Sequence, residues 1–137
     1  MQNRAEIEYR VPYADTDKMG VVYYANYLVY FERLRTELLR EAGLSYFQME
    51  EDGIMLPVIE AVCKYKKSAA YDDLLSISGQ VDTIKGPKVT ISCEVRKNNE
   101  LLVFGHTVHA CISTETRRPV RPPAVLMDLL HQSVTDK

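Results

Sequence analysis

Residues 26–42 constrain the fold of this chain more than any other segment. Apolar side chains recur there every three or four residues and mark one side of a helix: Tyr27, Phe31, Leu34, Leu38 and Ala42. Leu28, Val29 and Tyr30 widen the apolar arc to more than half of the circumference near the start. A helix with so wide an apolar surface has to be enclosed by other structure. We expect Asn26 to be its N-cap and Gly43 to follow it as the C′ residue.

Strand patterns occupy most of the remaining chain. One alternating run, residues 7–13, precedes the helix, and a short helical piece near residues 45–51 follows it. The later strand runs are joined by turns at residues 85–88 and 98–99, and they cover residues 57–67, 75–81, 89–95 and 102–113. A closing amphipathic helix fits residues 123–133. The pattern predicts an α+β domain in which one long central helix packs on an antiparallel sheet of about five strands.

The length of 137 residues fits a single domain that spans residues 1–137. A formal net charge of −2 argues against a nucleic-acid binder. The three cysteines, Cys63, Cys93 and Cys111, are widely spaced and are expected to be buried, reduced thiols. The sequence contains neither an apolar leader segment nor a membrane span, so we expect a cytoplasmic protein. Because the edges of an open sheet invite pairing with a second copy, we also expect a homo-oligomer.

Common motifs for metals, nucleotides and serine hydrolases fail in this sequence. Asp15 and Asp17 resemble the opening of an EF-hand loop, but the fifth and twelfth loop positions lack the required carboxylates. His106 and His109 stand three residues apart on an expected strand and therefore point to opposite faces. The chain has no GxGxxG motif, no P-loop and no GxSxG elbow. We expect neither a metal nor a bound cofactor.

Two carboxylates, Asp15 and Asp17, lie between the first strand and the long helix. Aspartates often cap turns by accepting a bond from the backbone amide two residues on, and for Asp15 this structural role is favoured. Asp17 precedes a stretch that leads into the helix N-terminus, where unpaired N–H groups and the positive dipole end suit a developing oxyanion. Enclosed by Val21, Val22 and Tyr24, the Asp17 carboxylate can act as nucleophile or general base.

Residues 13–27 read YADTDKMGVVYYANY and continue to Phe31 and Glu32. This stretch resembles the 4-hydroxybenzoyl-CoA thioesterase family, most closely its bacterial acyl-CoA thioesterases associated with the Tol–Pal system. The resemblance extends over nearly the whole chain. It implies a hotdog fold, in which the sheet wraps the long helix, and a homodimer or a dimer-of-dimers tetramer with active sites between subunits. The implied reaction is hydrolysis of an acyl-coenzyme A thioester to free acid and coenzyme A.

The resemblance assigns catalysis to Asp17 and polarisation of the thioester carbonyl to the backbone N–H of Tyr24. Many close relatives have histidine at the position of Tyr24, so the acyl group is left open. The neighbouring residues expected to contact the substrate are Gly20, Val22, Tyr23 and Tyr27. Core packing is the alternative role for Tyr27 and Tyr30.

Basic residues at two turns are candidate ligands for the phosphates of coenzyme A; they are Lys85, Lys88, Arg117 and Arg118. Solvation without a ligand is the alternative for such charged turns. A non-catalytic hotdog module that binds acyl-CoA or acyl-carrier protein is the alternative function. The carboxylate beside the helix start favours the enzyme, because a binding module does not need it.

Overall fold

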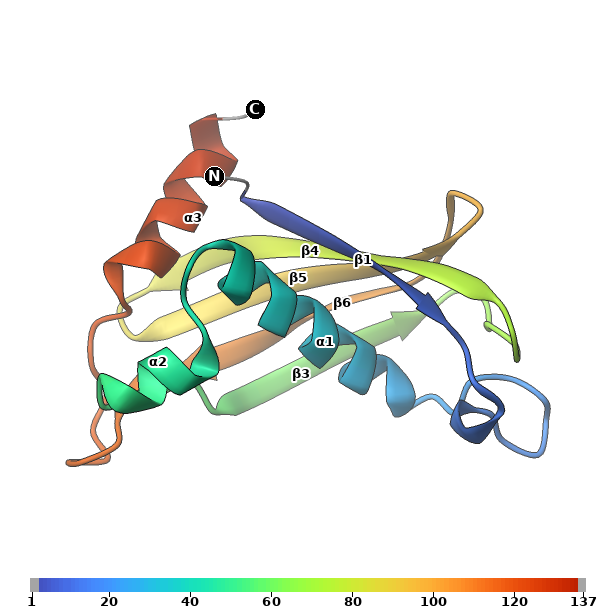
Figure 1. The fold of residues 1–137 in the computed structure, drawn as a ribbon, viewed down its shortest axis with the longest axis horizontal. Helices are drawn as coiled ribbons and strands as arrows, with labels where there is room; N and C mark the ends of the chain where they lie inside the picture. The colour runs from blue at the N-terminus through green and yellow to red at the C-terminus, as the bar shows by residue number, and fades with distance from the viewer. Residues whose placement is uncertain (1–2, 136–137) are drawn as a thin grey trace.

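The computed structural model describes residues 3–135, in which a long helix lies across one face of a sheet (Figure 1). In chain order the elements are β1 (Arg4–Arg10), the 3-10 turn η1 (Tyr13–Asp15), α1 (Asn26–Glu41), α2 (Tyr46–Glu51), β2 (Ile54–Met55), β3 (Val58–Tyr65), β4 (Leu74–Lys85), β5 (Lys88–Lys97), β6 (Glu100–Ala110), β7 (Ile112–Ser113) and α3 (Ala124–Thr135). Within the described residues, no helix is long and apolar enough to cross a membrane.

The main sheet has five antiparallel strands in the order β1-β4-β5-β6-β3, so β1 and β3 are its edges. The expected α+β architecture is confirmed. The two predicted turns join β4 to β5 and β5 to β6, and Gly86, Asn98 and Asn99 adopt the positive φ angles that tight turns require. The predicted last strand, residues 102–113, is interrupted after Ala110, and its end forms β7, which pairs with β2 in a separate two-stranded sheet.

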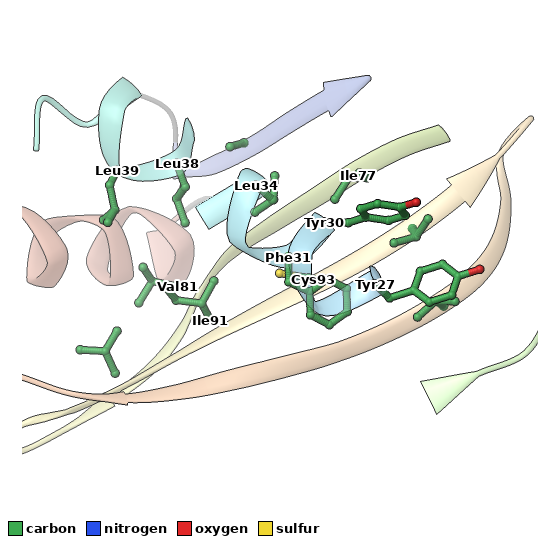
Figure 2. Close-up of a cluster of buried hydrophobic side chains, with 14 of the residues drawn as sticks. Tyr27, Tyr30, Phe31, Leu34, Leu38, Leu39, Ile77, Val81, Ile91 and Cys93 are labelled. Carbon is green, nitrogen blue, oxygen red and sulfur yellow. The ribbon is translucent and has the colours of Figure 1, made fainter. Parts of the chain in front are cut away.

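The core lies between α1 and the sheet. Figure 2 shows Phe31 and Leu34 of α1 directed toward side chains of β4 and β5, among them Ile77 and Ile91. All four are fully buried. Removal of this apolar surface from water is the main force that holds the helix on the sheet.

A row of small residues crosses the sheet at the middle of α1. It contains one residue from each strand in sheet order: Ala5, Gly79, Cys93, Gly105 and Cys63. A Cβ atom at Gly79 would lie 2.7 Å from Leu34 Cδ1 and 2.4 Å from the Ser92 carbonyl oxygen. The helix and the neighbouring strand therefore approach Gly79 more closely than any side chain there would permit.

The two ends of α1 differ in how well they follow the sequence. The predicted N-cap, Asn26, is instead the first helical residue; Ala25 occupies the cap without a side-chain bond. The Asn26 amide reaches back and donates to the backbone oxygen of Asp15 at 2.9 Å. At the other end, Gly43 has a φ of 85°, and the N–H groups of Gly43 and Leu44 donate to carbonyls of the last turn. This Schellman arrangement confirms Gly43 as the C′ residue.

We expected other parts of the chain to cover α1 over more than half of its circumference. In a single copy this prediction is wrong. Leu28 is 37% exposed and Val29 is 46% exposed. The edge strand β3 also leaves apolar side chains uncovered, with Val58 48% and Ile59 51% exposed. Apolar residues that the sequence pattern places inside are thus at the surface of one copy.

Candidate active site

A narrow hairpin between η1 and α1 carries Asp17. Thr16 and Val22 form an antiparallel bridge, and the Asp17 N–H donates to the Val21 carbonyl at 2.9 Å. Gly20 closes the turn by donating to the Asp17 carbonyl at 3.0 Å, and its φ of 80° favours glycine at that position. These bonds fix the backbone of Asp17 at the surface beside the start of α1.

The Asp17 carboxylate is half-buried, and one of its oxygens, Oδ1, accepts a hydrogen bond from the Met19 N–H at 2.8 Å. This is the turn-capping geometry that was favoured for Asp15. Among the described residues, the other oxygen of Asp17 accepts no hydrogen bond. Asp17 lines an open pocket of about 420 Å³ together with Tyr13, Ala14, Thr16 and Lys18. The carboxylate can therefore keep its turn and still take a proton from a bound water.

Asp15 has a structural role, but through its side-chain contacts with tyrosines. Its Oδ2 accepts hydrogen bonds from the Tyr9 hydroxyl at 2.7 Å and from the Tyr30 hydroxyl at 2.8 Å. Burial and the bond to Asp15 raise the pKa of Tyr9 to about 12, and the same causes raise the pKa of Tyr30. Asp15 thereby ties the loop to β1 and α1.

Tyr24 stands two residues before α1, and its backbone N–H donates no hydrogen bond within residues 3–135. The carbonyl of the same peptide group, which belongs to Tyr23, accepts from the Asn26 N–H at 2.8 Å. The side chains of Tyr23 and Tyr24 are exposed, and the Tyr23 pKa is raised first by its bond to Tyr24 and to a smaller extent by the negative charge of Asp17. A free donor and a carboxylate are thus held in one loop at the positive end of α1.

The expected substrate contacts divide into surface and core. Gly20 and Tyr23 are exposed beside Asp17, whereas Val22 and Tyr27 are buried. The Tyr27 hydroxyl accepts from the Ala69 N–H at 3.2 Å. In a single copy, Tyr27 and Tyr30 are thus core residues, which is the alternative role that the sequence left open for them.

Tyrosine rings form a continuous series through this region. Neighbouring rings have centroids 4.8 to 6.3 Å apart, and the series runs Tyr23, Tyr24, Tyr65, Tyr27, Tyr30 and Tyr9. All five neighbouring pairs are tilted or edge-to-face, and aromatic quadrupoles favour edge-to-face contacts. The series connects the edge strand β3 with the edge strand β1 past the N-terminus of α1.

The four candidate phosphate ligands lie far from Asp17 in one copy. Lys85 and Lys88 flank the β4–β5 turn, and the loop that carries Arg117 and Arg118 is at the same end of the molecule (Figure 1). Strand β4 has 12 residues and leads from the Asp17 end to that turn, a distance of about 36 Å. The structure therefore places these residues at one end of the molecule, away from Asp17.

The buried histidine, His109, is held by two hydrogen bonds. His109 is fully buried, and its ring bonds to Thr107 Oγ1 at 2.8 Å and to the Leu56 carbonyl at 3.0 Å. Burial lowers the pKa of His109, and the positive charge of Arg35 adds to the effect. Across the described part of the chain, no group of three or more His, Cys, Asp or Glu side chains could hold a metal ion.

Sequence reasoning missed Tyr65, whose hydroxyl donates to the Tyr24 carbonyl at 3.2 Å. The stretch that contains it, residues 57–67, shows no periodicity that would distinguish this tyrosine from its neighbours. Sequence reasoning also missed the hydrogen bond from the Tyr9 hydroxyl to Asp15. The Tyr65 contact joins segments 41 residues apart. The Tyr9 contact spans only six residues, but it depends on how the loop folds back after β1.

The sequence and the fold are similar to those of known proteins. The family model of the thioesterase-like superfamily matches residues 11–130. The acyl-CoA thioesterase YbgC of Haemophilus influenzae is 33% identical over 132 residues, which cover 96% of this chain and 97% of that protein. The acyl-CoA thioester hydrolase YbgC of Escherichia coli is 31% identical over 80% of this chain and 83% of that protein. The crystal structure of a DHNA-CoA thioesterase from Staphylococcus aureus superposes with a TM-score of 0.84 at 30% identity, covering 97% of this chain and 90% of that one.

The chain belongs to the thioesterase-like superfamily, and its helix-wrapping sheet is the expected hotdog fold. It is therefore an enzyme of the thioester hydrolase class, as its relatives are.

Proposed function

We propose that this protein hydrolyses acyl-coenzyme A thioesters to a free acid and coenzyme A. The observation that carries the proposal is the pairing, in one loop, of a half-buried carboxylate with an unbonded N–H. Asp17 supplies the first and Tyr24 the second. The names of the YbgC relatives support coenzyme A as the carrier. Within the superfamily, residues 13–27 favour the 4-hydroxybenzoyl-CoA thioesterase family and its Tol–Pal-associated branch.

The chemistry needs few groups, because a thiolate is already a good leaving group. The Tyr24 N–H donates to the thioester carbonyl oxygen and stabilises the negative charge that develops there; one such donor is worth about 3 kcal/mol. Asp17 takes a proton from the attacking water and returns it to the departing thiolate. Alternatively, Asp17 attacks the carbonyl carbon itself and forms a mixed anhydride, which water hydrolyses to the free acid after the thiolate has left. The tetrahedral intermediate then expels the coenzyme A thiolate, which is protonated to the thiol.

The complete site requires a second copy in this proposal. Strand β3 is an unpaired edge with Val58 and Ile59 exposed, and antiparallel pairing with the β3 of another copy would cover it. Such pairing sets the Val58 end of one copy beside the Tyr65 end of the other. The Val58 end of the sheet also carries Lys88, through the pairing of β3 with β6 and of β6 with β5.

The distance between the basic residues and Asp17 then has an explanation. Lys85, Lys88, Arg117 and Arg118 of one copy would reach toward the Asp17 loop of its partner and bind the phosphates of coenzyme A. A homodimer is the minimal form, and a dimer of dimers is the alternative assembly. We place the enzyme in the cytoplasm, where buried thiols such as Cys93 and Cys111 stay reduced.

The assembly is tested by its mass in solution. Light scattering at micromolar concentration should give at least twice the chain mass of 15.7 kDa. Ile59→Lys places a charge on the edge and should shift the protein toward the monomer with a loss of activity. Phe47→Lys is the matched control, because Phe47 is 70% exposed on α2 and outside β3. A monomeric wild type, or equal dissociation by both variants, would contradict pairing through β3.

The activity is tested by thiol release from a panel of aromatic, short-chain and long-chain acyl-CoAs. N-acetylcysteamine thioesters of the same acids lack the nucleotide and show how much the phosphates contribute. We expect catalytic release of coenzyme A from at least one member, with a much higher KM for its truncated counterpart. Stoichiometric binding without turnover would support the acyl-binding module instead.

A further inference from the structure

A single hydrogen bond joins the loop before α1 to the edge strand β3. Within residues 3–135, the bond from the Tyr65 hydroxyl to the Tyr24 carbonyl, at 3.2 Å, is the only one between residues 16–25 and β3. The other anchors of Tyr24 come from its own neighbourhood. They are the bond from Asn26 to the Tyr23 carbonyl and a longer one, at 3.4 Å, from the Tyr27 N–H to the Tyr24 carbonyl.

These bonds determine where the Tyr24 N–H points. The Tyr23 carbonyl belongs to the peptide group that carries this N–H, and the Tyr24 carbonyl belongs to the next one. Fixing both peptide groups fixes the backbone torsions of Tyr24 between them. Both bonds to the Tyr24 carbonyl are long for their kinds. Within the described residues, the Tyr65 hydroxyl is its only partner from outside the neighbouring turn.

Packing holds the Tyr65 ring in place for this contact. Its centroid lies 6.3 Å from that of Tyr24 and 5.6 Å from that of Tyr27, edge-to-face in both cases. Although Tyr65 is 49% exposed, its ring therefore has two neighbours that limit its rotamers. Burial raises the pKa of Tyr65 and keeps its hydroxyl protonated as a donor.

We propose that Tyr65 is a positioning residue for thioester hydrolysis, which holds the Tyr24 N–H toward the thioester carbonyl through its bond to the Tyr24 oxygen. The inference rests on the proposed function. Tyr65 acts through Tyr24 and needs no contact with the reacting atoms. Because it lies at the end of the strand proposed to pair with a second copy, it also links assembly to the orientation of the oxyanion donor.

The role predicts a specific kinetic pattern for Tyr65→Phe. The phenyl ring keeps both aromatic contacts, and only the hydroxyl is lost. An oxyanion donor acts mainly in the transition state, so kcat should fall about tenfold while KM changes less than twofold. The matched control is Tyr71→Phe: Tyr71 is 58% exposed at the same end, packs on Tyr13, and makes no side-chain hydrogen bond within the described residues. It should retain full activity.

An amide NMR spectrum gives a second readout that does not depend on turnover. The Tyr24 amide resonance should shift or broaden in Tyr65→Phe and remain in place in Tyr71→Phe. An unchanged kcat in Tyr65→Phe would overturn the positioning role. A rise in KM alone would overturn it too, because a change confined to KM indicates a residue that lines the substrate pocket. If the wild type hydrolyses no thioester, the proposed function fails separately. In that case, a Tyr24 amide resonance that does not shift in Tyr65→Phe would also overturn the proposal that Tyr65 positions the Tyr24 peptide group.

Discussion

Asp17→Asn should lower kcat for thioester hydrolysis by about 100-fold or more while the protein stays folded. Asparagine has nearly the same size, and its carbonyl oxygen can still accept the Met19 N–H that Asp17 Oδ1 accepts at 2.8 Å. What is lost is the negative charge that deprotonates water or attacks the carbonyl. Steady-state kinetics and thermal denaturation of the same preparation check both halves of the expectation.

Asp72→Asn is the matched control for this change. Asp72 is an exposed aspartate at the same end of the molecule, and asparagine tolerates its φ of 70°. It should keep wild-type kcat. Full activity of Asp17→Asn would refute the catalytic role. A parallel loss of activity and melting temperature would mean that Asp17 serves chiefly as the cap of its turn.

Gly79→Ala should lower the stability of the fold by about 3 kcal/mol, or roughly 10 °C in Tm. The new methyl group would lie 2.4 Å from the Ser92 carbonyl oxygen and 2.7 Å from Leu34 Cδ1. Leu34 can rotate only into a filled core, and the Ser92 carbonyl belongs to the adjacent strand β5. Either the helix lifts from the sheet or the pairing of β4 with β5 is distorted. Thermal or denaturant unfolding measures the loss.

Gly86→Ala separates this steric effect from the general cost of replacing a glycine. Gly86 lies in the β4–β5 turn with a φ of 59°, and a Cβ atom there meets nothing within 4 Å. Gly86→Ala should lower the free energy of unfolding by about 1 kcal/mol, from backbone strain alone. Equal losses for the two variants would show that the close approach at Gly79 has room to relax.

Local patterns predicted the elements of this fold but not all of their neighbours. The period of residues 26–42 defines α1, and the turn residues at 85–88 and 98–99 define two hairpins, because each is decided within a few residues. The place of β3 at the far edge beside β6 depends on pairing between Val58 and His109, which are distant in sequence. Apolar periodicity also cannot tell a surface buried by the same chain from one left for a second copy, hence the exposed Leu28 and Val29.

The candidate site shows the same division. Asp17 and Tyr24 lie seven positions apart in one motif, so a single stretch of sequence carries both. Tyr65 contacts Tyr24 across 41 positions, and only the folded chain reveals the bond. For Asp15, the sequence suggested a local cap, whereas two tyrosines from β1 and α1 compete successfully for its carboxylate.

The tyrosine series also gives this protein an optical property. The chain contains nine tyrosines and no tryptophan, so its ultraviolet fluorescence is dominated by tyrosine emission. Six of these rings form the spatial series described above, in which neighbouring centroids are no more than 6.3 Å apart. This spacing is close enough for excitation to migrate from ring to ring. Tyr9 and Tyr30, whose phenols donate to the Asp15 carboxylate, are the last two rings at one end of that path. Because Tyr23 and Tyr24, at the other end of the path, lie in the loop that carries Asp17, we expect occupancy of the site to change the tyrosine emission of the unlabelled protein.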